Sequence, residues 1–331
     1  MNAADVLILG AGPVGCTLAL ALQGARHRVR LVEPRPDALP AFRPIALSHA
    51  SRLILERLGA WGSFPATPIE SIHVSQAGAF GRTRMDAGDA GVPALGYVTQ
   101  YADLVAALRA RVGLEGEPGE PAALTVHAEG AAGEARERHY GHQAVVARVR
   151  AEPASLAMAY ERFTAEGPLA LLPLAGEWAL VWSARPQRAA ALAAAPQEEF
   201  LRELQAAFGE RAGRFVAAAQ RACVPLALRT RPSRVEARTA YIGNAAQALH
   251  PVAGQGLNLG LRDAWDLAQA LHAADDPGSA GVLARFAAQR RLDAAATGRE
   301  AGERRGGGDS SPREPAGVAV RAKPAPAIIT R

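Results

Sequence analysis

A glycine-rich segment near the N-terminus has residue types suited to holding a phosphorylated ligand. The segment Gly10–Gly15 reads Gly-Ala-Gly-Pro-Val-Gly, follows the apolar run Val6–Leu9 and opens a helical pattern. In that setting Gly10 permits a tight turn, Gly12 lets the backbone approach a pyrophosphate, and Gly15 lets the helix pack close to the strand. The helix then directs its positive dipole end at the phosphates. The candidate cofactor-binding residues of this motif are Gly10, Gly12, Pro13 and Gly15.

An acidic residue in the right place strengthens this interpretation. A second apolar run, Val29–Val32, ends at Glu33. A carboxylate at the end of the second strand of a βαβ unit accepts hydrogen bonds from ribose hydroxyls, so Glu33 is a further cofactor-binding candidate. The alternative, a glycine turn with no ligand, does not explain the strand, the helix and the carboxylate together. The motif alone leaves NAD and FAD both open.

A second glycine-rich stretch favours FAD. Gly243-Asn244 follows the apolar run 239–242, and the stretch continues through His250-Pro251 to a glycine loop where a helix begins. Such a helix can aim its N-terminal dipole and N–H groups at the N1/C2=O edge of a flavin, where negative charge develops on reduction. The glycines let the ring lie against the backbone. The alternative is a buried loop and helix cap. The candidate cofactor-binding residues here are Gly243, Asn244, Gly254, Gly256, Leu257 and Asn258.

The elements that must position these motifs form an alternating pattern of strands and helices. This order predicts an α/β fold, a Rossmann-like FAD-binding domain with a second, mostly antiparallel β substrate domain. Strands are expected at 6–9, 29–32, 124–126, 144–149, within 169–182, and at 239–242. Helices are expected at 48–58, 101–112, 198–208, 258–273 and 281–296.

The expected domain organisation is discontinuous. Residues 1–70, 101–139 and 239–297 are predicted to form the FAD-binding domain, and residues 71–100 and 140–238 the substrate domain. Residues 298–331 contain no aromatic residue and no helical periodicity, which predicts a disordered tail.

Composition excludes several other classes of function. The chain has 331 residues, a net charge of +5 and no stretch in which basic and aromatic residues alternate, so no nucleic-acid partner is expected. Cys16 and Cys223 are distant, and His139 and His142 lack neighbouring ligands, so we expect no disulfide and no metal site. The apolar stretch 6–22 is short and interrupted by glycines, and an acidic segment precedes it. This predicts neither a membrane span nor a secretory signal, hence a cytoplasmic protein.

Four segments resemble a known family. They are DVLILGAGPVG, FRPIALSHASRLILERLGAW, AYERFTAEGPLALLPL and AYIGNAAQALHPVAGQGLNLGLRDAWDLAQAL. The chain resembles FAD-dependent aromatic hydroxylases of the para-hydroxybenzoate hydroxylase superfamily, in the ubiquinone-biosynthesis branch (the 2-polyprenyl-6-methoxyphenol hydroxylase type). The resemblance implies hydroxylation of a polyprenylated phenol with FAD, O₂ and NAD(P)H as a transient co-substrate. It also implies peripheral contact with the inner membrane and association with other ubiquinone-pathway proteins.

The resemblance assigns roles to further residues. Arg43 matches an arginine near the flavin, and Gln100 a polar residue that contacts the cofactor. The segment 128–130, Ala-Glu-Gly, resembles the family's middle Asp-Gly motif. His250 and Pro251 match the substrate-side wall at the flavin and are the catalytic candidates. An ordinary surface arginine at 43 and a solvated loop residue at Glu129 are the alternatives.

The chain also departs from the family pattern. Asn244 stands where most members have Asp, although its oxygen remains an acceptor for the flavin ribityl chain. The short connector 113–123 replaces several strands, which predicts an exposed sheet edge. The match ends near residue 297. These departures support a second hypothesis, a non-catalytic FAD-binding remnant or interaction subunit of the quinone pathway. A third is a flavin reductase or dehydrogenase that consumes no oxygen.

Overall fold

A computed structural model describes residues 5–34, 42–79, 81–117, 119–130, 136–153, 157–248 and 255–302 of the chain. The chain divides into two compact units, residues 1–288 and 289–331. Both glycine motifs and the sheets of the described residues belong to the first unit.

A five-stranded sheet carries the first glycine motif. Its order is β14-β15-β8-β1-β2, parallel except for β14, which runs antiparallel to β15. The strands are β1 (Val6–Leu9), β2 (Val29–Val32), β8 (Leu124–His127), β14 (Val235–Glu236) and β15 (Thr239–Tyr241). Val6, Ile8 and Val126 share one face of the sheet and are fully buried in the core that this face forms with the helices. The predicted α/β Rossmann-like fold is confirmed.

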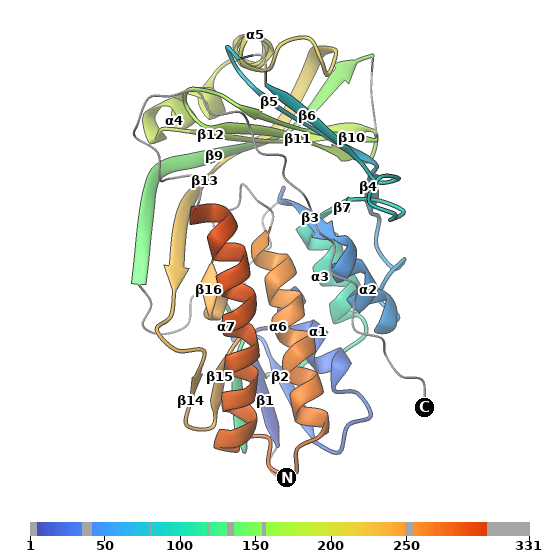
Figure 1. Cartoon of the computed structure of the whole chain (residues 1–331), viewed down its shortest axis with the longest axis vertical. Coiled ribbons are helices and arrows are strands. Elements are labelled where there is room, and N and C mark those ends of the chain that lie inside the picture. The colour runs from blue at the N-terminus through green and yellow to red at the C-terminus, as the bar shows by residue number, and fades with distance from the viewer. Residues whose placement is uncertain are drawn as a thin grey trace. The chain divides into compact units, whose positions relative to one another are not determined.

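Helices share this hydrophobic core with the sheet. They are α1 (Pro13–Ala21), α2 (His49–Arg57), α3 (Tyr101–Arg109), α6 (Gln255–His272) and α7 (Ala280–Gly302). Helices α1 and α6 pack side by side along the sheet (Figure 1). Helix α1 is apolar on every side because nearly all of its residues are buried, against the sheet on one side and against α3 and α6 on others.

An eight-stranded, mostly antiparallel sheet forms the second layer. Its order is β16-β13-β9-β12-β11-β10-β5-β6, in which only β5 and β10 pair in parallel. The strands are β5 (Ser71–Gln76), β6 (Arg82–Asp86), β9 (Arg136–Glu152), β10 (Met158–Phe163), β11 (Pro168–Leu174), β12 (Glu177–Ala184), β13 (Arg214–Thr230) and β16 (Gln247–Ala248). The mostly antiparallel sheet therefore contains β5 and β6, which precede all of its other strands in the chain.

The two faces of this sheet have different neighbours. One face packs Trp178 and Trp182 under two helices, α4 (Pro186–Ala194) and α5 (Gln197–Phe208). Figure 1 shows both helices over this sheet. The other face packs Ala159 and Val146 against a three-stranded sheet. That small sheet has the order β3-β7-β4 and is formed by β3 (Pro44–Ser48), β4 (Thr67–Ile69) and β7 (Gly96–Gln100).

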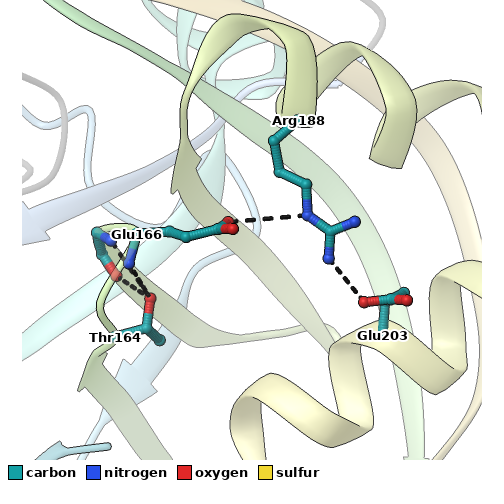
Figure 2. A network of polar contacts seen from close by, with 5 residues as sticks. Thr164, Glu166, Arg188 and Glu203 are labelled. Carbon is teal, nitrogen blue, oxygen red and sulfur yellow. Dashed lines mark hydrogen bonds and ion pairs between the residues drawn. The ribbon is translucent and has the colours of Figure 1, made fainter.

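A polar network ties the two covering helices to the sheet. In Figure 2, Arg188 of α4 lies between Glu166, in the β10–β11 turn, and Glu203 of α5. Its Nη2 donates to Glu203 Oε2 at 2.6 Å, and its Nε lies 3.8 Å from Glu166 Oε2. The Thr164 hydroxyl holds the turn by donating to Gly167 O at 2.7 Å. The network therefore fixes the turn relative to both helices.

Three boundaries bear on the predictions. Helix α6 begins at Gln255, three residues before the expected start, and α7 continues to Gly302, past the expected start of the tail at residue 298. Residues 303–331 lie outside the described residues. Strand β2 is the edge of its sheet, and within the described chain only an isolated parallel bridge between Val32 and Glu115 meets its outer side. The expected sheet edge is therefore present, and the segment around Glu115 covers part of it.

Candidate functional site

The first glycine motif has the geometry that its spacing predicts. Gly10 has a φ of +103°, and a Cβ there would lie 2.5 Å from the Cα of Glu129. A Cβ at Gly15 would lie 1.9 Å from the carbonyl oxygen of Gly10. Glycine is therefore required at both positions, for a left-handed turn and for close packing of helix on strand. Gly12 is the N-cap of α1 and provides no side-chain cap, so the first N–H groups of α1 are positioned for an external acceptor.

Glu33 holds the turn between β1 and α1. Its Oε2 accepts hydrogen bonds from Ala11 N and from Arg109 Nη2, both at 2.9 Å. Arg109 Nε in turn donates to Ala11 O at 2.8 Å. The backbone N–H and C=O of Ala11 are thus both held by one ion pair. Sequence analysis did not identify Arg109, because its role depends on a contact between α3 and a distant turn.

Cys16 lies behind the same turn and is structural. Its thiol is fully buried and donates to Ala11 O at 3.4 Å. Burial raises the pKa of this thiol to about 12, against the opposing effect of the Arg109 charge. The side chain therefore stays protonated and packs within α1.

Tyr101 connects Arg43 and Gln100 to the first glycine motif. It contacts Arg43, follows Gln100 in the chain and faces Gly12. Tyr101 N donates to Arg43 O at 2.9 Å, and the Arg43 guanidinium carbon lies 4.4 Å from the centroid of the Tyr101 ring. Gln100 pairs with Pro44 and is the N-cap of α3. A Cβ on Gly12 would lie 3.3 Å from Tyr101 Oη, so this tyrosine faces the start of α1. Burial raises the pKa of Tyr101, so its hydroxyl remains a hydrogen-bond donor.

The structure brings the two glycine motifs into contact at Val14. A Cβ on Gly243 would lie 3.0 Å from Val14 Cγ2, and a Cβ on Gly260 would lie 2.7 Å from the same atom. Gly243 also has a φ of +58°, at the start of the short helix η1 (Gly243–Ala245). Neither glycine can gain a side chain unless Val14 moves. The start of α1 and the segment after β15 therefore form one site.

Asp263 of α6 anchors Gly243 of the second motif. The side chain is fully buried on α6, and its Oδ2 accepts from Gly243 N at 3.0 Å and from Arg234 Nη1 at 3.1 Å. A buried carboxylate needs such partners to offset its loss of hydration. The sequence motif contained Asp263, but its anchoring role was not predicted.

Asn258 acts within the protein. Its Oδ1 accepts from Ser48 N at 2.8 Å and from Ser51 Oγ at 2.7 Å, and its Nδ2 donates to Ala46 O at 2.9 Å. The Asn258 side chain therefore joins α6 to the β3–α2 segment, and its contact with the cofactor stays a prediction. Asn244 is exposed on η1.

Glu129 is not a solvated loop residue. Its side chain is 13% exposed, and its Oε1 lies 2.7 Å from His127 Nδ1. The His127 ring stacks on Tyr241, with centroids 4.9 Å apart, and the Arg231 guanidinium carbon lies 3.6 Å from the Tyr241 ring centroid. The ends of β8 and β15 are thus joined by a stack of a histidine, a tyrosine and an arginine.

Part of the predicted site has no structural description. His250, Pro251 and Gly254 lie outside the described residues, so their roles stay predictions. Gly256 and Leu257, in the first turn of α6, are half-buried.

The described residues fit FAD. The uncapped start of α1 suits a pyrophosphate, and the cations Arg43 and Arg109 lie around it. Glu33 stands at the carboxyl end of β2, where a ribose is expected. The second motif meets the first through Val14, as a single dinucleotide that spans both would require.

Fold and site together define a class, the FAD-binding proteins with a Rossmann-like domain. The chain belongs to the family described as "FAD binding domain", which it matches over residues 3–148 and 106–301. It is 33% identical to a ubiquinone hydroxylase, UbiL, of Rhodospirillum rubrum over 88% of this chain and 78% of that protein. It is 30% identical to the 3-demethoxyubiquinol 3-hydroxylase of Escherichia coli over 87% of this chain and 86% of that protein.

Solved structures share the fold. PqsL of Pseudomonas aeruginosa superposes with a TM-score of 0.71 at 22% identity, over 89% of this chain and 94% of that chain. HpxO of Klebsiella pneumoniae, solved with FAD and uric acid, superposes with a TM-score of 0.68 at 16% identity, over 86% of this chain and 83% of that chain.

Proposed function

We propose that this chain is an FAD-dependent monooxygenase that hydroxylates a polyprenylated phenol in ubiquinone biosynthesis, with NAD(P)H as transient electron donor. The observation that carries the proposal is the meeting of the two glycine motifs at Val14 in a chain related to ubiquinone hydroxylases over more than three quarters of their length. When bound, FAD supplies the redox and oxygen chemistry.

The residues of this chain bind and orient that cofactor. The start of α1 would hold the pyrophosphate, with Arg43 adding positive charge, and Glu33 would accept from a ribose. Helix α6 would present its N-terminus to the flavin ring. The Asp263–Arg234 ion pair holds Gly243, and so keeps the ring side of the site in place. The residues proposed to contact FAD are Gly10, Gly12, Pro13, Gly15, Glu33, Arg43, Gln100, Gly243, Asn244, Gly254, Gly256, Leu257 and Asn258.

The substrate domain that we propose comprises residues 71–100 and 140–238. Its support is the apolar face of the eight-stranded sheet that meets the three-stranded sheet, where Ile72, Leu172 and Val181 are only partly buried. An apolar wall suits a phenol with a polyprenyl chain. His250 and Pro251 would orient the ring at the flavin.

The apolar substrate also supports peripheral contact of a cytoplasmic protein with the inner membrane. Within the described part of the chain, no helix has the length and apolar character needed to cross a membrane. Association with other ubiquinone-pathway proteins is proposed on the same ground, since a water-insoluble intermediate must pass between enzymes.

The test begins with the visible spectrum of the purified protein and the amount of FAD released on denaturation. We expect near-stoichiometric FAD, and NAD(P)H oxidation with O₂ uptake that a polyprenylated phenol stimulates. Glu33→Gln should weaken FAD binding about tenfold or more, because a charge-assisted acceptor is lost. Glu117→Gln, at an exposed position, is the matched control and should not change it.

The alternatives have their own outcomes. FAD without any NAD(P)H turnover would support a non-catalytic remnant, for which the incompletely paired β2 edge is the structural argument. Substrate reduction without O₂ uptake would support a reductase or dehydrogenase. A colourless protein that cannot be reconstituted with FAD would refute the flavoenzyme proposal.

A further inference from the structure

A cavity lies at the β5–β6 end of the eight-stranded sheet. It has a volume of about 320 Å³ and is lined by His73, Arg82, Thr83, Arg84 and Arg211. None of these residues belongs to the glycine motifs or to the elements that carry them.

The strand register shows which face of the sheet this cavity occupies. His73 pairs with Tyr160, which packs with α5 in the helix-covered core. The neighbouring residues Ile72 and Ala159 point to the other face, toward the three-stranded sheet. The cavity is therefore on the helix-covered face, opposite to the face proposed for the phenol, and constitutes a separate site.

The cavity is positively charged. Register places Arg84 opposite His73 and Arg82 opposite Ser75, so both arginines share the face of His73. Arg84 is neutralised by Asp86, to which its Nε and Nη2 donate at 3.0 and 2.8 Å. Arg82 and Arg211 have no carboxylate partner among the residues that the structure describes. Two guanidinium charges therefore remain uncompensated at one cavity.

His73 fixes one of these charges in place. The residue is 7% exposed, and Arg211 Nη1 donates to its Nε2 at 2.6 Å. Nε2 can accept only from a neutral imidazole, and burial together with the charges of Arg211, Arg82 and Arg84 lowers the pKa of His73. The neutral ring orients the guanidinium, whose other N–H groups are still available to a ligand.

We propose that this cavity binds the phosphate group of a phosphorylated ligand. The planar donor fork of a guanidinium matches the oxygens of a phosphate, and a second arginine supplies the charge that a dianion requires. The cavity is larger than a phosphate alone needs, which leaves room for the group that bears the ester. A soluble phosphate ester and a lipid headgroup share this chemistry.

The experiment titrates the full-length, FAD-loaded protein with inorganic phosphate, with glycerol 3-phosphate, and with phosphatidylcholine vesicles with or without phosphatidic acid. Isothermal calorimetry gives the affinity, and NMR of the His73 imidazole follows its pKa. We expect phosphate, but not chloride at equal ionic strength, to bind and to raise the pKa of His73, because an anion offsets the arginine charges. When inorganic phosphate binds, binding of glycerol 3-phosphate identifies a metabolite site, and binding of the phosphatidic acid vesicles without binding of glycerol 3-phosphate identifies a headgroup site.

Two variants locate the site. Arg82→Ala and Arg211→Ala should each weaken phosphate binding about tenfold or more, since each removes a charge-assisted contact. Arg202→Ala, an exposed arginine on α5, is the matched control and should bind as the parent protein does. FAD content should be unchanged in all three, which separates this test from that of the proposed function. Absence of phosphate binding, or binding that both cavity variants retain, would overturn the proposal.

Discussion

Replacing Asp263 should uncouple the second glycine motif from α6. The carboxylate is fully buried and holds both Gly243 N and Arg234, whose side chain is 12% exposed. Asp263→Ala leaves a nearly buried guanidinium without its charge partner, a loss that costs about 3 to 5 kcal/mol of unfolding free energy. Asp263→Asn keeps an oxygen for Gly243 N. It should therefore lose about 1 to 3 kcal/mol less than the alanine variant, the value of one buried backbone hydrogen bond.

Urea unfolding of the FAD-free protein, followed by circular dichroism, measures these differences. The double variant Asp263→Ala/Arg234→Met should regain part of the stability, because no unpaired charge is then buried. Asp275→Asn is the control, since its ion pair with Arg26 is exposed and contributes little. A loss below about 1 kcal/mol for Asp263→Ala, or equal losses for the alanine and asparagine variants, would refute the anchoring role.

Three further predictions concern the packing of the fold. A thiol reagent at pH 8 should modify Cys223 alone in the native protein and both cysteines after denaturation, because Cys223 is exposed whereas Cys16 is fully buried and its pKa is raised to about 12. Reaction of Cys16 in the native protein would contradict this. Gly15→Ala should cost more than about 3 kcal/mol of stability and abolish FAD binding, because its Cβ overlaps a carbonyl oxygen; a folded variant that binds FAD would refute the close packing. Arg188→Ala should shift the unfolding free energy by less than about 1 kcal/mol, because the ion pairs of Figure 2 are partly exposed; urea unfolding checks it.

The sequence pattern predicted those strands and helices that depend on interactions between residues close together in the chain. The apolar runs gave β1, β2, β8 and β15, and the spacing of Leu104, Val105 and Leu108 gave α3, where all three are buried. The requirement for glycine at Gly10 and Gly15 also followed from sequence, because a left-handed turn and a helix–strand contact depend on neighbouring residues.

Tertiary contacts could not be predicted in the same way. No spacing rule links Arg109 to Glu33 or Asp263 to Gly243, because each pair is formed by elements that meet only in the folded chain. Asn258 shows the same limit. Its position in a glycine-rich loop predicts a cofactor contact but gives no indication that its amide also joins α6 to β3. The sequence likewise did not predict that β5 pairs with β10, the pairing that places His73 beside Tyr160.

The hydrogen bonds of Asn258 also set a time order for folding. They join Ser48 to a residue 210 positions later in the chain. A ribosome that adds about 5 to 20 residues per second completes that span in about 10 to 40 s. Until α6 emerges, the apolar N-terminal strand and helix lack the partner that covers them. The nascent chain therefore exposes α1 for most of its synthesis, and an early-binding chaperone should protect it.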